Sequence, residues 1–252
     1  MKNLKKKILA ATIAIALIGI ILFIANAFVG NPITKKMADK AIKEYVDANY
    51  SDLHLKVEGS SYDFKNGSYV GIAKSETSID TKFKVYYQDG KAQRDDYEFS
   101  VLELNNTEQR FSDEYSDIVK KIVAENLGYV DNTTMVNFDK NEHDKIKSTL
   151  KLDMKFDKTL PIKTEVLFRI DLEDYSIERI ANFFIDARKA LKEEGYEFSK
   201  YSLDSTEGST YVMVNDVTNE DIDSGELLNL LEKGNDDKSG TGISVLIHGE
   251  KK

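Results

Sequence analysis

The sequence contains no cysteine, no tryptophan and only two prolines among its 252 residues. The lack of cysteine excludes a disulfide framework, a thiolate metal site, a cysteine nucleophile and a lipid attached through cysteine. The lack of tryptophan removes one ring suited to stacking against sugars, although tyrosine can replace it. Two prolines argue against long extended linkers. Because 41% of the residues are hydrophobic, the chain is still predicted to fold, and to do so through packing alone.

Charge is divided unevenly along the chain. The formal net charge is −9, and the first 29 residues contain four lysines and no acidic residue. Setting aside those four positive charges leaves −13 for the remaining residues. A surface of this sign repels nucleic acid and anionic lipid headgroups over the distances that salt does not screen. We therefore expect no nucleic-acid partner.

The N-terminus combines a basic patch with a long apolar run. The segment Ile8–Val29 carries no charge, and as a helix it would extend about 33 Å, enough to cross the hydrocarbon core of a bilayer. The basic residues before it are Lys2, Lys5, Lys6 and Lys7. Because positive flanks stay in the cytoplasm, residues 1–30 are predicted to be the signal-anchor of a single-pass protein of the cell membrane, with an extracytoplasmic C-terminal part.

A cleaved signal peptide is the alternative interpretation of the same segment. Ala25-Asn26-Ala27 has the small residues that signal peptidase prefers, and cleavage there would release a chain that begins at Phe28. The apolar run from Ile8 to Ala25 is longer than the roughly 7 to 15 residues of a typical signal peptide, which favours the anchor. Both interpretations place the function of the chain outside the cytoplasm.

Residues 31–128 are predicted to form an N-terminal α+β domain. Asn31 suits the cap of a helix and Pro32 suits its first turn, so we expect a helix that ends near Asn49. A second helix is expected from about Asn106 to Gly128, a residue type that commonly ends helices.

Alternating apolar and polar residues predict a four-stranded antiparallel meander between these two helices. The turn signals Asn66-Gly67 and Asp89-Gly90 fall between the alternating runs, as tight hairpins require. The apolar positions that define three of the strands are Leu53, Leu55 and Val57; Phe83, Val85 and Tyr87; and Tyr97, Phe99 and Val101.

Residues 129–148 are irregular and rich in Asn, Asp and Thr, and we interpret them as the connection to a second domain at 149–252. Alternation predicts two strands at its start, a helix follows, and two strands, a short helix and a final strand complete it. The predicted segments are Leu150–Phe156, Val166–Leu172, Ile177–Leu191, Phe198–Leu203, Tyr211–Val217, Ser224–Lys233 and Ile243–His248. From Thr164 onward the order βαββαβ predicts a ferredoxin-like domain, so the fold class is α+β.

The sequence offers no recognisable catalytic, cofactor-binding or metal-binding residues. His54, His143 and His248 have no partner at metal-ligand spacing, and each is expected to be a solvated residue of a strand or loop. Neither a G-x-S-x-G motif nor a phosphate-binding glycine loop is present: Gly59-Ser60-Ser61 falls in a predicted strand and Gly240-Thr241-Gly242 precedes one.

Acidic residues crowd two loops and raise the question of calcium. The residues are Asp216, Glu220, Asp221 and Asp223 in one loop and Asp236 and Asp237 in the other. Neither loop matches the twelve-residue calcium pattern. We expect helix-start chemistry instead, in which Asp223 or Ser224 caps a helix and Glu226 lies at the positive end of its dipole.

Four segments resemble the YfjL-like proteins of Gram-positive bacteria, and the likeness covers nearly the whole chain. The segments are NPITKKMADKAIKEYV after the predicted anchor, SIDTKF at 78–83, LDMKFDKTLP at 152–161 and VMVNDVTNEDIDSGEL, which starts at Val212. The resemblance implies a membrane segment followed by distinct N-terminal and C-terminal domains. That family is functionally uncharacterised, so it implies neither an active site nor a cofactor.

Three functions remain open for the exported part. We favour a non-enzymatic binding or interaction region, because small helix-and-sheet domains beside a membrane commonly serve recognition. A cell-envelope hydrolase that uses paired carboxylates is the alternative, and a cleft with converging Asp or Glu residues would favour it. A regulator of a neighbouring membrane protein is the third possibility, for which an exposed sheet edge or apolar patch is expected.

Overall fold

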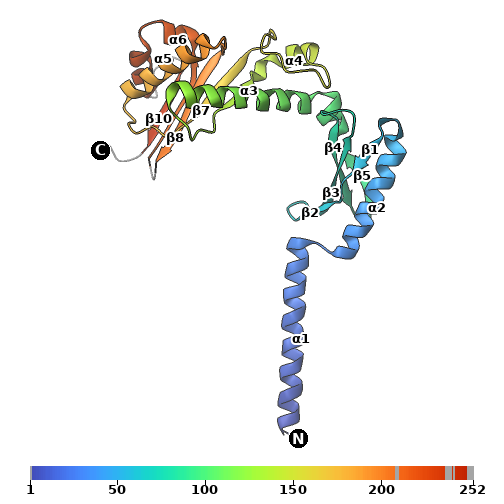
Figure 1. Ribbon diagram of the computed structural model, residues 1–252. Coiled ribbons are helices and arrows are strands. Elements are labelled where there is room, and N and C mark those ends of the chain that lie inside the picture. The colour runs from blue at the N-terminus through green and yellow to red at the C-terminus, as the bar shows by residue number, and fades with distance from the viewer. Residues whose placement is uncertain (1, 208–209, 236–239, 241, 249–252) are drawn as a thin grey trace. The chain divides into compact units, whose positions relative to one another are not determined.

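The computed structural model describes residues 2–207, 210–235, 240 and 242–248. The chain divides into two compact units, residues 1–106 and residues 107–252. Each unit combines helices with a largely antiparallel sheet, so the α+β class predicted from the sequence is confirmed (Figure 1).

The first unit begins with two helices. Helix α1 (Lys2–Val29) is uninterrupted, and α2 (Pro32–Asn49) follows after Gly30 and Asn31. The Asn31 side chain accepts hydrogen bonds from the backbone N–H groups of Ile33 (2.8 Å) and Thr34 (3.4 Å). These bonds satisfy donors that have no partner within the helix. The predicted helix and its Asn31 cap are therefore confirmed.

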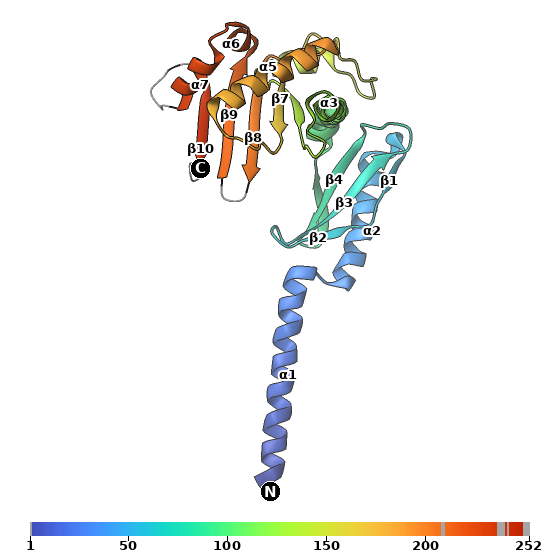
Figure 2. The ribbon, with the colours of Figure 1, turned by 60° about the vertical axis from the view of Figure 1, so that its left-hand side comes forward.

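The sheet of the first unit is an antiparallel arrangement in the order β1-β3-β4-β5, with β2 paired to β3 beside β1. Because β1 and β2 follow each other along the same edge of β3, they replace one strand of the predicted meander. Figure 2 shows α2 beside this sheet, where Ala38, Ile42 and Val46 are buried. The strands are β1 (Leu55–Val57), β2 (Ser61–Asp63), β3 (Ser68–Ser75), β4 (Lys82–Gln88) and β5 (Lys91–Asp95).

The predicted strand at Tyr97, Phe99 and Val101 is wrong. This segment forms a π-helical turn, η2 (Glu98–Leu102), in which Val101 is buried while Phe99 is 61% exposed. The Asp95 carboxylate accepts a hydrogen bond from the backbone N–H of Tyr97 at 2.8 Å, which turns the chain away from the sheet. The apolar alternation here reflects the packing of Tyr97 and Val101 on the core rather than strand pairing.

Helix α3 (Asn105–Leu127) was expected in the first domain, but its buried residues belong to the core of the second unit. They include Tyr115, Val119, Ile122 and Val123, and the helix ends before Gly128, whose φ of 81° favours glycine.

The predicted connection at 129–148 is not irregular throughout. It contains the strand β6 (Met135–Phe138), the short helical turn η3 (Lys140–Glu142) and the start of α4 (His143–Thr149). Val136 and Phe138 are buried, and β6 pairs antiparallel with β7 (Thr164–Arg169). The segment is rich in Asn, Asp and Thr because these residues favour the turns around β6. One example is Asp139, whose side chain caps η3.

The predicted strand at Leu150–Phe156 is also wrong. The segment pairs with no strand, and its alternation arises because it packs against α3 instead. The Phe156 ring lies 5.5 Å from that of Phe111 and 5.3 Å from that of Tyr115, measured between ring centroids. Arg110 donates a hydrogen bond of 2.7 Å to the backbone carbonyl of Met154.

The sheet of the second unit has the order β10-β9-β8-β7-β6. Strands β7 and β8 are parallel direct neighbours joined through α5, and the other pairs are antiparallel. The βαββαβ order of elements is present, but the ferredoxin-like arrangement is not, since that fold places another strand between the two parallel ones. The remaining elements are α5 (Ile177–Glu193), β8 (Lys200–Glu207), β9 (Thr210–Thr218), α6 (Asn219–Asp223), α7 (Leu227–Asn235) and β10 (Ser244–His248).

One face of this sheet is buried under α5, α6 and α7 (Figure 2). Phe168, Tyr201 and Leu203 are completely buried there, and rings of Phe183 and Phe184 from α5 pack against Phe168. A single core of this size can hold the unit together without disulfides.

The outer edge of β6 is closed by α3. The buried Ser116 hydroxyl accepts a hydrogen bond of 2.8 Å from the Val136 backbone N–H and donates one of 2.6 Å to the Ser112 carbonyl. A buried backbone N–H without a partner is costly. Ser116 therefore supplies the partner that a further strand would otherwise supply.

We predict that Ser116→Ala lowers the free energy of unfolding by about 1–3 kcal/mol, because it leaves the Val136 N–H buried without an acceptor. Urea denaturation of the full chain in detergent measures this, and hydrogen exchange at Val136 should accelerate. Ser148→Ala is the control, since Ser148 is exposed and bonds only within α4. Equal stability of the two variants would contradict the assigned role.

Candidate functional site

Helix α1 is the first candidate functional element. It is long and apolar enough to cross a membrane, and no part of its apolar stretch is buried by the described structure. Its large exposed side chains are Leu4, Ile8, Leu9, Ile13, Ile15, Leu17, Ile18, Ile20, Ile21, Leu22, Phe23, Ile24, Phe28 and Val29. A helix of this length and composition is typical of a membrane-spanning segment, and a signal sequence near the N-terminus has the same features.

A tight junction joins the end of α1 to the first sheet. The Tyr69 hydroxyl, on β3, accepts a hydrogen bond of 2.5 Å from the Asn31 backbone N–H and donates one of 2.9 Å to the Asn31 carbonyl. Gly30 has φ 77°, and a Cβ atom there would lie 2.6 Å from the Tyr69 hydroxyl oxygen. Glycine is therefore required at position 30 by both backbone and space.

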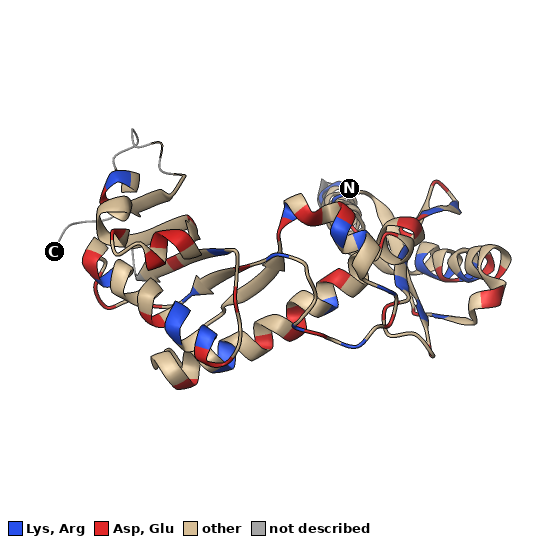
Figure 3. Cartoon of the chain, turned by 90° about the horizontal axis from the view of Figure 1, so that it is seen from above, with Lys and Arg blue, Asp and Glu red and all other residues tan. Residues whose placement is uncertain are grey.

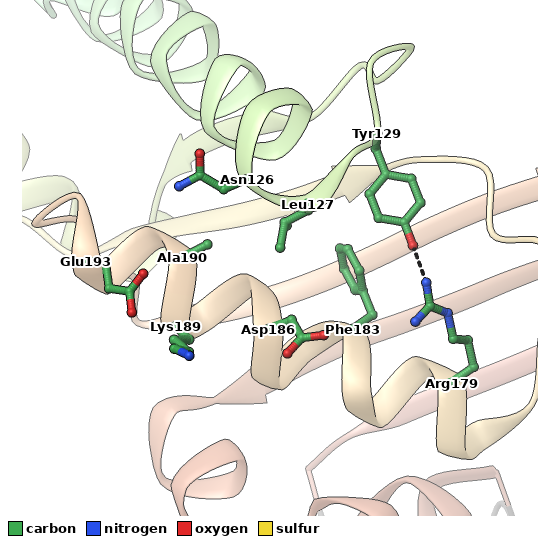
Figure 4. A pocket seen from close by; sticks show the side chains of 9 residues that line it. All are labelled: Asn126, Leu127, Tyr129, Arg179, Phe183, Asp186, Lys189, Ala190 and Glu193. Carbon is green, nitrogen blue, oxygen red and sulfur yellow. Dashed lines mark hydrogen bonds between the residues drawn. The ribbon is translucent and has the colours of Figure 1, made fainter.

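A groove in the second unit is the second candidate. It has a volume of about 290 Å³ and lies between the last turn of α3 and one face of α5 (Figure 4). Its floor is Phe183, 2% exposed, whose ring packs edge-on against Tyr129 with 5.6 Å between centroids. The lining residues are Asn126, Leu127, Tyr129, Arg179, Phe183, Asp186, Lys189, Ala190 and Glu193.

Helical spacing places most of these side chains on one stripe of α5. Arg179, Phe183, Asp186, Ala190 and Glu193 recur at intervals of three or four residues, which brings them to one face. The Ser176 hydroxyl accepts a hydrogen bond from the Arg179 N–H and fixes the start of this helix.

The rim of the groove carries charges of both signs. Arg179 donates a hydrogen bond of 3.0 Å to the Tyr129 hydroxyl, which closes one end (Figure 4). Within the described part of the chain, the side chains of Asp186, Lys189 and Glu193 have neither a hydrogen bond nor an ion pair. An apolar floor with unpaired donors and acceptors around it can hold a mixed polar and apolar group.

Tyrosines clustered around Asp95 in the first unit have raised pKa values. The Asp95 carboxylate accepts hydrogen bonds from the Tyr45 hydroxyl at 2.7 Å and the Tyr50 hydroxyl at 2.8 Å. Burial, followed by the hydrogen bond and negative charge of Asp95, raises the pKa of Tyr45 to about 12, and the same causes raise the pKa of Tyr50. The cluster joins the end of α2 to β5 and is structural.

The structure keeps the three histidines apart from one another and from the groove. His54 follows the turn η1 (Ser51–Leu53), His143 begins α4, and His248 ends β10 with its ring 5.1 Å from that of Tyr211. All three are exposed. Within the described residues no group of three or more His, Asp or Glu side chains could hold a metal ion.

The acidic residues near α6 have separate partners. Asp216 accepts a hydrogen bond of 2.7 Å from Lys200, and Asp221 forms a capping box with Thr218. Asp223 forms a two-fold ion pair with the buried Arg188, whose hydrogen bonds lower the pKa of Asp223. Asp223 therefore does not cap the following helix α7, because Arg188 holds its carboxylate. The other predicted cap, Ser224, accepts a hydrogen bond of 2.9 Å from the Glu226 backbone N–H just before α7. Asp236 and Asp237 lie outside the described residues.

The remaining sequence candidates have structural roles. Ser60, in Gly59-Ser60-Ser61, donates through its hydroxyl and its backbone N–H to Asp39 at 2.7 and 2.6 Å, which ties the turn between β1 and β2 to α2. In Gly240-Thr241-Gly242, Thr241 lies outside the described residues. The groove was missed because its stripe on α5 looked like an ordinary solvated face, and Tyr129 reaches it from 50 residues away.

Comparison with known proteins gives matches over most of the chain. The family model described as "YfjL-like, N-terminal domain" matches residues 5–101, and the one described as "YfjL-like C-terminal domain" matches residues 114–232. The chain belongs to the YfjL-like family. The resemblance noted in the sequence is thereby confirmed.

A curated relative matches most of this YfjL-like chain. "Uncharacterized protein YfjL" of Bacillus subtilis (strain 168) is 23% identical over 203 residues, which cover 79% of this chain and 84% of the relative. No solved structure matches the chain significantly. All residues that line the groove lie within residues 114–232, the segment matched by the YfjL-like C-terminal domain. None of the comparisons assigns a ligand to the groove.

We predict that the stability of the YfjL-like N-terminal unit falls as the pH rises from 10 towards 12. Tyr45 keeps its proton in the folded chain up to a pKa of about 12, but loses it near 10 when unfolded. The folded state thus binds more protons in this window, and raising the pH favours unfolding.

Titration of phenolate absorbance, taken as the difference between the parent and Tyr45→Phe, measures the pKa of Tyr45. Asp95→Asn should bring this pKa closer to 10 because it removes the negative charge. Asp52→Asn, on an exposed residue of η1, is the control. An unchanged pKa in Asp95→Asn would contradict the cause assigned here.

Proposed function

We propose that this YfjL-like protein is a single-pass membrane protein that presents its two α+β units outside the cytoplasm, where the C-terminal unit binds a protein partner. The observation that carries the proposal is α1: a 28-residue helix with an apolar stretch of which no part is covered by the described structure. The lysines at its N-terminal end support a cytoplasmic N-terminus.

The groove supports a protein partner in preference to a buried small molecule. At about 290 Å³ it is at the lower limit of pockets that enclose a ligand, and it suits one or two side chains of a protein segment. Half-buried Leu127 offers an apolar contact, and the unpaired Asp186 and Lys189 can pair with charges on a partner. This arrangement resembles an interface, where an apolar centre is surrounded by polar groups.

The strongly acidic composition does not prevent such recognition. Acidic and basic residues are interspersed in the sequence of both units rather than separated by sign, as Figure 3 shows. At physiological salt, charges farther apart than about 8 Å are largely screened. The local rim of the groove, rather than the net charge, therefore decides which partner is accepted.

Cysteine labelling tests the topology cleanly, because the chain contains no native cysteine. We expect a membrane-impermeant maleimide to label Lys155→Cys in intact cells, and to label Lys5→Cys only after the membrane is opened. The reverse pattern would contradict the orientation. Mass spectrometry of the same protein separates the anchor from the signal peptide, since cleavage after Ala27 would remove α1 up to that residue.

A photo-crosslinking amino acid at Asp186 tests the groove. We expect it to capture a reproducible partner from membranes that hold the full chain, while the same group at Lys155, exposed in the loop before β7, does not. Lys189→Glu should weaken this capture about tenfold by reversing one rim charge, and Lys155→Glu should not. Equal capture at both positions would refute the groove as the binding site.

A further inference from the structure

Three large apolar side chains of the first unit are exposed beside the end of α1. Ile33 is 70% exposed, Met37 55% and Phe64 53%. Ile33 and Met37 are one turn apart on α2, on its exposed side, while Ala38, Ile42 and Val46 are buried in the core. We call Ile33, Met37 and Phe64 the juxtamembrane patch.

The patch is continuous with the apolar surface of α1. The ring of Phe64 lies 5.8 Å from that of Phe28 in the last turn of α1, measured between centroids. Figures 1 and 2 both show the turn after β2 and the start of α2 next to that last turn. The hydrogen bonds between Tyr69 and Asn31 hold both segments at this position.

The turn that carries Phe64 is built to hold its shape. The Asp63 carboxylate accepts hydrogen bonds from the Lys65 backbone N–H at 3.0 Å and from the Asn66 side chain at 2.6 Å. Gly67 completes the turn with φ 63°. The phenyl ring of Phe64 is therefore presented to the outside by a defined turn, although burying it would be favourable.

We propose that the juxtamembrane patch enters the headgroup and upper acyl region of the bilayer that α1 spans. This inference rests on the proposed membrane anchoring of α1. A lipid surface is favoured over a protein because the patch continues the surface that lipid would already cover, with only Gly30 and Asn31 between α1 and α2. An apolar surface flanked by lysines can lie in the interface with its side chains about 5–10 Å into the boundary between headgroups and acyl chains.

The charges beside the patch suit lipid headgroups. The first turns of α2 contain Lys35, Lys36 and Lys40 with a single acidic residue, Asp39, and Lys65 follows Phe64 directly. Lys35 pairs with Asp39 at 2.8 Å, whereas Lys36 and Lys65 are exposed without an ion pair in the described structure. Lysine side chains can lie along apolar surface with their charge at the phosphates.

A fluorophore sensitive to its surroundings, attached to single cysteines of the full chain in phosphatidylcholine and phosphatidylglycerol vesicles, tests the patch. The positions are Phe64→Cys, Met37→Cys, and Ile79→Cys as the matched control. Ile79 is 65% exposed and apolar like Phe64, but lies at the other end of β3, about 25 Å along an eight-residue strand. Vesicles with brominated acyl chains supply the quencher, and unbrominated vesicles are the reference.

We expect the probes at Phe64 and Met37 to emit at shorter wavelength and to lose intensity in brominated vesicles, and the probe at Ile79 to do neither. The inference is overturned if Phe64 and Met37 behave like Ile79. A probe at Ile15→Cys, in the middle of α1, separates the two proposals. If the Ile15 probe is not quenched, membrane anchoring itself fails; if it is quenched while Phe64 and Met37 remain in water, only the patch inference fails.

Discussion

The exposed apolar surface of α1 is the constraint on which the rest of the structure depends. Fourteen large hydrophobic side chains of this helix are exposed and have no place in either core. On insertion scales each Leu, Ile, Phe or Val contributes roughly 0.3–0.6 kcal/mol in favour of the membrane, so together they favour insertion by several kcal/mol. No comparable driving force exists in water, where the helix would expose its whole surface. If α1 spans a membrane, as proposed, the rest of the chain begins at the membrane surface, directly after Val29.

The junction after α1 fixes the start of α2 against the first sheet. Gly30 allows the chain to turn sharply, Asn31 caps α2, and Tyr69 of β3 bonds to both backbone groups of Asn31. The chain thus passes from the apolar helix to the first core within two residues. The two bonds from Tyr69 hold the start of α2 against β3.

Local chemistry made α1, α2 and α5 predictable. Asn31 and Pro32 identify the start of α2, and the apolar period of 3.6 residues identifies α5. Alternation was less reliable, because it shows only which side chains are buried. Leu150 to Phe156 alternate since they pack on α3, and no strand pairs with them. The order of strands could not be predicted, because pairing between β7 and β8 is decided by the path of α5 rather than by either strand alone.

The groove and the juxtamembrane patch escaped prediction for the same physical reason. A surface site is assembled from residues that are individually ordinary. Arg179 looks like any solvated arginine until the Tyr129 hydroxyl is found 3.0 Å away, and Phe64 looks like a turn residue until Phe28 is found beside it. Of these three candidate elements in the described part of the chain, α1 is the one contiguous in sequence, so its long apolar helix could be predicted whereas the groove and the patch could not.

The acidic character of residues 30–252 is compatible with the proposed contact between the juxtamembrane patch and a bilayer once distance is considered. Residues 30–252 carry a net charge of −13, but physiological salt largely screens interactions between exposed charges more than about 8 Å apart. Most acidic residues would therefore not affect a contact made by α2 and the turn after β2. At that contact lysines outnumber acids, with Lys35, Lys36, Lys40 and Lys65 against Asp39 and Asp63. The same net negative charge would repel other parts of the surface from anionic lipid. Under the proposed membrane contact, attraction at the patch and repulsion elsewhere would together leave the first unit resting on its apolar end.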